Sequence, residues 1–193
     1  MKNRKEPPKP PSPKRTVNVI NDREEVNGVT YTAARKTTKF TITHGKRTRQ
    51  TLEDNNITFD DVDADGLMIP HNDALVISLL IHDTNVKRVL IDPCSSVNII
   101  LLRVLNEMLM GDRVVPKARS LSGFDNSSVI TEGKIELSTY TYGVIKETKF
   151  QVIDTDMVYN VILGRPWIHD MDVVPSTLHQ VIKFPSKWGI QQI

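Results

Sequence analysis

The sequence is poor in the residues on which several classes of site depend. It has one cysteine, Cys94, among 193 residues, so an intramolecular disulfide and a zinc site built on cysteines are both excluded. The five histidines show no metal-ligand spacing, and we expect neither a metal nor a cofactor. No apolar run approaches the roughly 18 residues that span a bilayer. The residues after Met1 are basic rather than apolar, so no secretory signal is expected. These absences predict an intracellular protein without a membrane segment, with cytoplasm and nucleus both left open.

The net charge is small, but the charged residues are strongly segregated along the chain. The formal net charge is only +2, yet residues 1–50 hold 13 Lys and Arg against 4 Asp and Glu. Residues 51–73 hold no basic residue and 7 acidic ones, and residues 74–193 hold 12 of each. Such segregation indicates separate segments with separate roles.

This pattern predicts three parts. Residues 1–50 are expected to be a basic, largely disordered tail, because their proline- and lysine-rich start cannot bury enough apolar surface to fold. Residues 51–69 are expected to be an acidic linker, and residues 70–193 the folded domain. The basic stretch 46–49 suits a weak contact with RNA phosphates, although a solvated linker is the simpler interpretation.

The domain of residues 70–193 reads as mainly β. The predicted strands cover residues 74–81, 86–91, 120–124, 129–138, 144–153, 159–163, 173–176 and 180–184. Apolar residues recur with a helical period over residues 97–110, where Ser95 or Ser96 can cap a helix and Gly111 can end it. A second short helix is expected through about Asp170. Many short strands with one or two helices predict a small all-β barrel.

One aspartate stands where acid–base chemistry can be built. Asp92 ends an apolar strand and enters a tight turn of small residues, and Ile162-Leu163-Gly164 follows about 70 residues later. Aspartic proteases hold an aspartate in such a turn beside a second one. The two carboxylates share one proton, because like charges so close together cannot both ionise. One carboxylate then activates water while the other donates a proton.

Several phrases of the sequence resemble one known family. Residues 89–96, VLIDPCSS, look like the strand and catalytic turn of retropepsin-like proteases, in which the turn reads Asp-Thr/Ser-Gly-Ser. Residues 159–167, YNVILGRPW, are similar to a segment of gypsy-type plant retrotransposon Gag-Pol polyproteins, as are residues 70–76 and 175–180. The resemblance covers about 60% of the chain, from about residue 70 to 190, and implies a retropepsin-like acid protease barrel.

The resemblance also implies roles for individual residues. Asp92 matches the catalytic aspartate, within an active-site turn of Pro93, Cys94, Ser95 and Ser96. A flap that closes over a bound peptide falls on residues 123–133, and Ile162-Leu163-Gly164 matches the segment beneath the turn. The flap residues are Gly123, Phe124 and Gly133. One such aspartate per chain implies a homodimer that cleaves peptide bonds of its own polyprotein.

Two residues of the turn depart from the family pattern. Pro93 replaces Thr or Ser and lacks an N–H, and Cys94 replaces a glycine that allows close backbone approach. Three hypotheses therefore stand: an active endopeptidase, an inactive module of the same fold for dimerisation or peptide binding, and an RNA-associated Gag-Pol connector.

Simpler interpretations stand beside the catalytic ones. Asp92 could cap the following helix, and Gly123 and Gly133 could be plain turns. Cys94 is expected to be a small buried thiol rather than a nucleophile. Trp167 is expected to anchor the core, and Arg165 to be a surface or interface charge.

Overall fold

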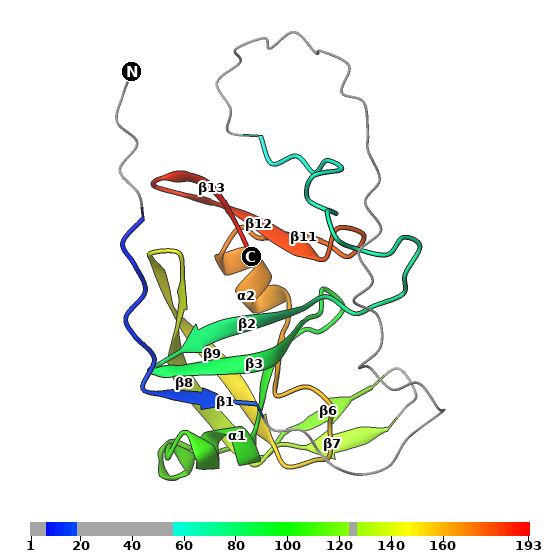
Figure 1. Cartoon of the computed structure of the whole chain (residues 1–193). Helices are drawn as coiled ribbons and strands as arrows, with labels where there is room; N and C mark the ends of the chain where they lie inside the picture. Colours follow the sequence, from blue (N-terminus) through cyan, green and yellow to red (C-terminus); the bar gives the residue numbers. More distant parts are fainter. Residues whose placement is uncertain (1–6, 19–55, 124–126) are drawn as a thin grey trace, which may run out of the picture.

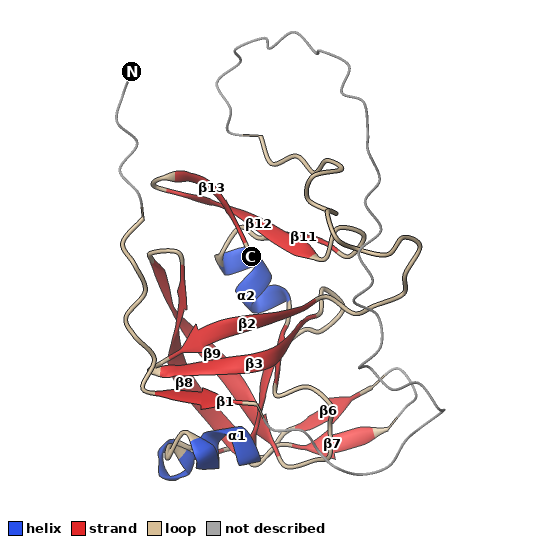
Figure 2. Ribbon diagram, in the orientation of Figure 1, coloured by secondary structure: helices blue, strands red, loops and turns tan. Residues whose placement is uncertain are grey.

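The computed structural model describes residues 7–18, 56–123 and 127–193. Figure 2 shows that strands dominate this part of the chain and that its two α-helices are short. No helix within it is long and apolar enough to cross a membrane. The basic stretch 46–49, and with it most of the predicted tail, lies outside the described residues.

Six strands close into a barrel. They are β2 (Val76–Ile81), β3 (Thr84–Ile91), β4 (Asn98–Leu101), β8 (Gly133–Thr141), β9 (Val144–Ile153) and β10 (Val161–Leu163). The order is β3-β10-β4-β9-β8-β2, and pairing of β2 with β3 closes the ring. The predicted fold class, a small mainly β barrel of the retropepsin type with short helices, is confirmed.

Hairpins and apolar alternation explain this ring. The β2–β3 and β8–β9 pairs are antiparallel hairpins, and the turn of the second uses Tyr142 and Gly143, both with positive φ, as tight two-residue turns require. Buried residues alternate along β8, and the core includes Val89, Ile100 and Phe150, each 0% exposed. Alternation of this kind places one face of each strand inside the barrel.

The remaining elements lie around the barrel (Figure 1). They are β1 (Arg15–Val17), α1 (Leu102–Glu107), the 3₁₀ turn η1 (Gly111–Arg113), β5 (Val115–Pro116), β6 (Ser120–Ser122), β7 (Ser128–Ile130), α2 (Arg165–Asp170), β11 (Val174–Ser176), β12 (Val181–Ser186) and β13 (Gly189–Gln192). β6 and β7 form a separate two-stranded hairpin, and β11, β12 and β13 a three-stranded sheet. Trp167 of α2 is 2% exposed, which confirms it as a core anchor.

The predicted helix over residues 97–110 is wrong in its first half. Residues Asn98–Leu101 form β4, and only Leu102–Glu107 are helical. β4 pairs with both β9 and β10, so it fills the gap in the ring. The apolar spacing fits both conformations, and this pairing on both edges decides for the strand.

The N-terminal region, predicted to be largely disordered with a short β-like run at residues 17–20, contributes a strand. Residues Arg15–Val17 form β1 and pair in parallel with the start of β3. Val17 is 2% exposed, so it belongs to the core. The chain therefore adds to the barrel from well before residue 70.

Candidate active site

β3 delivers Asp92 to one end of the barrel. The strand is anchored by the buried Val89 and Ile91, and it runs beside β10 in parallel, with Ile91 opposite Leu163. The N–H of Asp92 donates to the carbonyl of Leu163 at 3.0 Å, which continues the ladder one residue past the strand. The backbone of the aspartate is thereby fixed before the turn begins.

The turn itself is closed by short local hydrogen bonds. The N–H of Cys94 donates to Oδ1 of Asp92 at 2.9 Å, and the N–H of Ser95 donates to the Asp92 carbonyl at 3.2 Å. The Ser95 hydroxyl donates to the Val97 carbonyl at 2.7 Å. Since a strand follows the turn, the alternative in which Asp92 caps a helix is wrong, and so is a helix capped by Ser95 or Ser96.

The segment after β10 holds the far side of the turn. The N–H of Arg165 donates to the Ser95 carbonyl at 3.0 Å. A Cβ on Gly164 would lie 2.8 Å from that same carbonyl oxygen, closer than real Cβ atoms come. The structure thus brings Leu163 and Gly164 directly against the Asp92 turn, while Ile162 pairs with Ile99 of β4.

Asn98 ties this segment to the barrel. Its side chain is 4% exposed. Oδ1 accepts the Gly164 N–H at 3.0 Å, and Nδ2 donates to the Lys149 carbonyl of β9 at 3.1 Å. A buried amide with both ends bonded fixes three strands relative to one another. The sequence analysis did not find this residue, since an asparagine inside an expected helix carries no such signal.

Arg165 has a role at the turn that the sequence analysis did not predict. Its Nη1 donates to the carbonyls of Pro93, at 3.1 Å, and Cys94, at 2.8 Å. The side chain is at the surface, as predicted, but it braces the turn rather than standing free in solvent. The phrase Gly164-Arg165-Pro166-Trp167 was the available signal, and it was used only for the family resemblance.

The side chains of the turn face outward. Asp92 and Ser95 are half-buried, whereas Pro93, Cys94 and Ser96 are exposed. The prediction that Cys94 is a buried thiol is wrong: the thiol is free and exposed. The backbone of the turn is hydrogen-bonded to Leu163 of β10 and to Arg165. The side chains of its middle residues therefore point away from the barrel.

The β6–β7 hairpin lies in the region expected for a flap. The N–H of Gly123 donates to the Ser127 carbonyl at 2.9 Å and begins the hairpin tip, and Phe124 falls outside the described residues. Gly133 is buried at the start of β8 and lies in the barrel rather than in the hairpin. The hairpin projects on the side toward which β3 runs (Figure 1).

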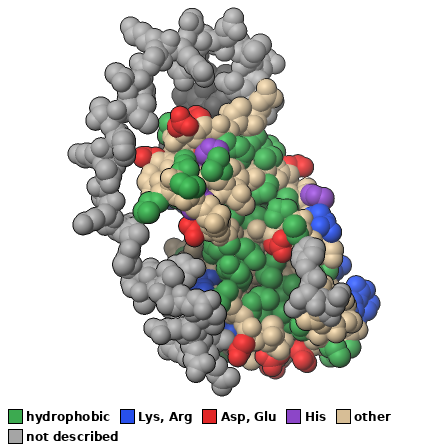
Figure 3. Space-filling model, turned by 90° about the vertical axis from the view of Figure 1, so that its right-hand side faces the viewer, with side chains coloured by type: hydrophobic (Ala, Val, Ile, Leu, Met, Phe, Trp, Pro, Cys, Tyr) green, Lys and Arg blue, Asp and Glu red, His purple; other side chains and the backbone are tan. Residues whose placement is uncertain are grey.

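The surroundings of Asp92 within one chain are simple. Among the described residues, its only side-chain hydrogen bond comes from Cys94, and no group of three or more metal-binding side chains is present. Neither of the two cavities described here, of about 300 and 220 Å³, is lined by Asp92. Figure 3 views the side of the hairpin and shows hydrophobic side chains gathered in a central band.

Comparisons with known proteins give structural matches alone. No protein-family model and no curated protein matches the chain. The retroviral protease-like domain of Ddi1 from Leishmania major is 17% identical, with a TM-score of 0.47; the alignment covers 58% of this chain and 90% of that domain. The EIAV protease, solved with the inhibitor HBY-793, is 18% identical with a TM-score of 0.44, over 57% of this chain and 99% of the other.

Proposed function

We propose that this chain carries an aspartic endopeptidase domain of a plant gypsy-type retrotransposon polyprotein, active as a homodimer with one Asp92 from each copy. The observation that carries the proposal is the placement of Asp92. It stands at the end of a core strand, in a turn held by β10 on one side and Arg165 on the other. An acid–base catalyst needs such a fixed carboxyl group.

Within one chain, one of the two carboxylate oxygens of Asp92 accepts a hydrogen bond. Oδ1 of Asp92 accepts the Cys94 N–H, and in the described part of the chain Oδ2 makes no hydrogen bond. In the proposed dimer, the two outer oxygens would approach each other and a water molecule. One proton shared between the pair leaves one base to activate the water and one acid to protonate the scissile carbonyl.

The side of the molecule from which the β6–β7 hairpin projects carries a band of hydrophobic side chains (Figure 3). Large exposed apolar patches mark interaction sites, and this supports an interface or a peptide site on this side. The β6–β7 hairpin, with Gly123 at its tip, is the proposed flap. Gly133, in the barrel wall, would serve as its base.

The test is cleavage by the whole chain, using casein and the chain itself as substrates. We expect cleavage that a statine-type transition-state inhibitor blocks, and that falls at least about 100-fold in Asp92→Asn, because a proton-transfer catalyst is lost. Asp112→Asn, a change at an exposed carboxylate of η1, is the matched control and should keep full activity. Cleavage that survives in Asp92→Asn would refute the assignment.

A second candidate has its own observation in its favour. Pro93 has no N–H to donate across a dimer, and the Cys94 side chain occupies the exposed tip of the turn, where two copies would meet. The same fold would then serve dimerisation or peptide binding without catalysis. Inactivity of both the natural chain and Cys94→Gly, with dimers still seen by sedimentation, would favour this candidate. Activity gained only by Cys94→Gly would identify the thiol as the lesion.

The third hypothesis, an RNA-associated connector, rests on the charge of residues 1–50 alone. It requires salt-dependent RNA binding that is lost when that basic charge is removed. RNA binding that persists after substitution of Lys46, Arg47 and Arg49 by glutamine would count against a role for this stretch.

A further inference from the structure

The N-terminal segment of residues 7–13 is rich in proline and lies against the folded domain. Five of its seven residues are proline. Proline fixes its own φ and forces the preceding residue into an extended conformation, so this run favours a polyproline II helix. In the structure the segment belongs to no helix or strand. It runs past the turns of the β8–β9 and β12–β13 hairpins on the way to β1 (Figure 1).

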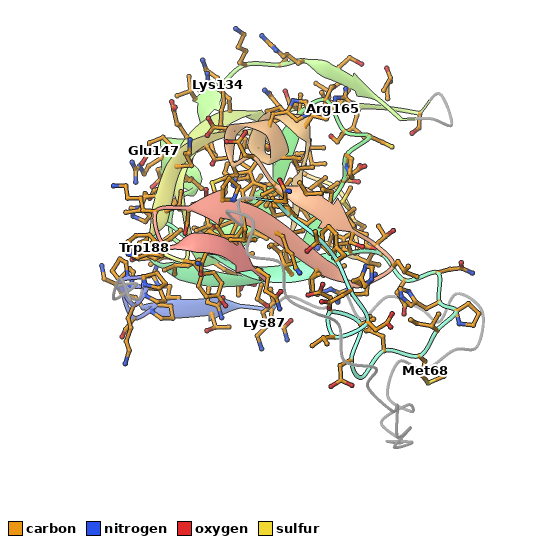
Figure 4. All side chains as sticks on the ribbon, turned by 90° about the horizontal axis from the view of Figure 1, so that it is seen from above. Met68, Lys87, Lys134, Glu147, Arg165 and Trp188 are labelled. Atoms are coloured by element: carbon orange, nitrogen blue, oxygen red, sulfur yellow. The ribbon has the colours of Figure 1, made fainter. Side chains whose placement is uncertain are left out.

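The turn at Gly143 is the centre of the surface that this segment meets. Gly143 has φ +80. A Cβ built there would lie 2.7 Å from two carbons of the Trp188 indole and 2.8 Å from Cδ of Pro8. The indole and the proline ring therefore both press on the bare backbone of one glycine. Trp188 belongs to the β12–β13 turn, and Figure 4 shows it beside the N-terminal segment.

An apolar cavity includes Tyr142, the neighbour of Gly143 in the same turn. It has a volume of about 300 Å³, and its lining includes Pro10, Tyr140, Tyr142, Leu80 and the C-terminal Ile193. Tyr142 is 47% exposed. Pro10 thus borders a cavity that two tyrosines line, and Pro8 meets Trp188 at the Gly143 turn, while both prolines keep an exposed side.

Further contacts fix the direction of the segment. The Lys14 N–H donates to the Asp83 carbonyl at 2.8 Å, and the Lys14 Nζ pairs with the Asp83 carboxylate at 3.3 Å. Next, Arg15 Nη1 donates to the Met108 carbonyl at the end of α1, at 2.7 Å. The prolines therefore stand directly before a strand, β1, that pairs with β3 of the barrel, and this pairing fixes the direction of the segment.

We propose that Tyr140, Tyr142 and Trp188 form a binding site for a proline-rich polyproline II segment, and that residues 7–13 of this chain are its occupant. Aromatic side chains in a row are the usual partners of such a helix, which is already stiff and loses little entropy on binding. Gly143 is required because any side chain there would push the indole and Pro8 apart. The site lies apart from Asp92 and does not depend on the proposed protease function.

The first experiment measures acrylamide quenching of Trp188 fluorescence in the full chain. The only other tryptophan, Trp167, is 2% exposed and contributes little to quenching. In Pro8→Ala/Pro10→Ala we expect the quenching constant to rise by about twofold or more, because the indole loses the Pro8 ring beside it and the segment loses its Pro10 contact with the tyrosine cavity. Trp188→Phe should abolish this difference and so assign it to Trp188.

The matched control is Pro11→Ala/Pro13→Ala, which removes the same number of prolines. It should leave quenching near that of the natural chain. An equal rise in both double variants would show that general stiffness, rather than docking, protects the indole. No rise in either would show that the prolines do not cover it. Both results would overturn the proposal.

The second experiment supplies the segment from outside. A synthetic peptide with the sequence of residues 6–14, added to Pro8→Ala/Pro10→Ala, should return the quenching constant toward its natural value in a saturable manner. The same peptide with alanine at the positions of Pro8 and Pro10 should not. Equal effects of both peptides, or of neither, would exclude a site that recognises proline.

Discussion

The Asp92 turn and the acidic segment of residues 56–66 are both held against the β framework, but by different kinds of interaction. The turn is fixed largely by backbone groups, including the 3.0 Å bonds from Asp92 to Leu163 and from Arg165 to Ser95. The acidic segment is fixed largely by one lysine of β12. Lys183 donates to the Thr58 carbonyl at 2.9 Å and to the Asp63 carboxylate at 2.7 Å.

This lysine sits in a small cluster. Its Nζ lies 5.1 Å from the ring centroid of Phe59, and that ring stacks on His179 with centroids 5.4 Å apart. The side chains of Lys183 and Asp63 are only 13% and 7% exposed. The Asp92 turn is therefore held largely by backbone hydrogen bonds, whereas the acidic segment depends on one carboxylate–ammonium pair.

The largest expected effect on the Asp92 turn comes from a substitution at Gly164. In Gly164→Ala, the new Cβ would collide with the Ser95 carbonyl, and we expect a loss of about 3 kcal/mol in the free energy of unfolding, as for overpacking at a rigid position. Urea denaturation followed by circular dichroism measures it. Gly111→Ala is the control, since a Cβ there meets mainly the Asn106 side chain, which can move. Similar losses in the two variants would show that the turn is not held rigidly.

The acidic segment should respond to pH through Asp63. The hydrogen bond from Lys183 lowers the pKa of Asp63 below its ordinary value near 3.8, against burial, which raises it; the Asp60 N–H lowers it further. A depressed folded-state pKa means that the pair stabilises the fold above the ordinary value and loses its effect as pH falls through the folded pKa.

The substitution Asp63→Asn tests this. At pH 6 we expect it to lower the free energy of unfolding by about 2 kcal/mol, the typical contribution of a hydrogen bond to a charged group. The gap to the natural chain should narrow as pH falls below 3.8, because both proteins then carry a neutral side chain at this position. Asp61→Asn, at an exposed carboxylate, should change little at either pH. A gap that stays constant down to pH 2 would contradict an electrostatic origin.

The difference between local and long-range interactions also explains which features could be predicted from the sequence. Strand β9 (Val144–Ile153) has its predicted bounds, and the Asp92 turn stands at the end of its strand, because apolar alternation and turn residues are local signals. β4 was missed because its spacing suits a helix equally well, and pairing with β9 and β10 decides for the strand.

Contacts between residues far apart in the sequence could not be predicted either. Lys183 and Asp63 are 120 residues apart, and no local pattern marks them as partners. Cys94 looked like a buried thiol by its residue type alone, and its exposure follows from how Arg165 and β10 bind the turn backbone. Burial in a loop is set by the neighbours that the fold supplies.

The smallest expected effect concerns Arg165, whose charged side chain braces the turn from the segment after β10. Because it is exposed and bonds to the Pro93 and Cys94 carbonyls, Arg165→Ala should cost no more than about 1 kcal/mol in global stability. It should nevertheless loosen the turn, and Cys94, the only cysteine of the chain, reports on that directly. We expect faster alkylation of the thiol by iodoacetamide in Arg165→Ala than in the natural chain. Arg113→Ala, which removes another exposed guanidinium, should leave the rate unchanged. Equal rates in all three proteins would mean that the Arg165 side chain does not help to position the turn.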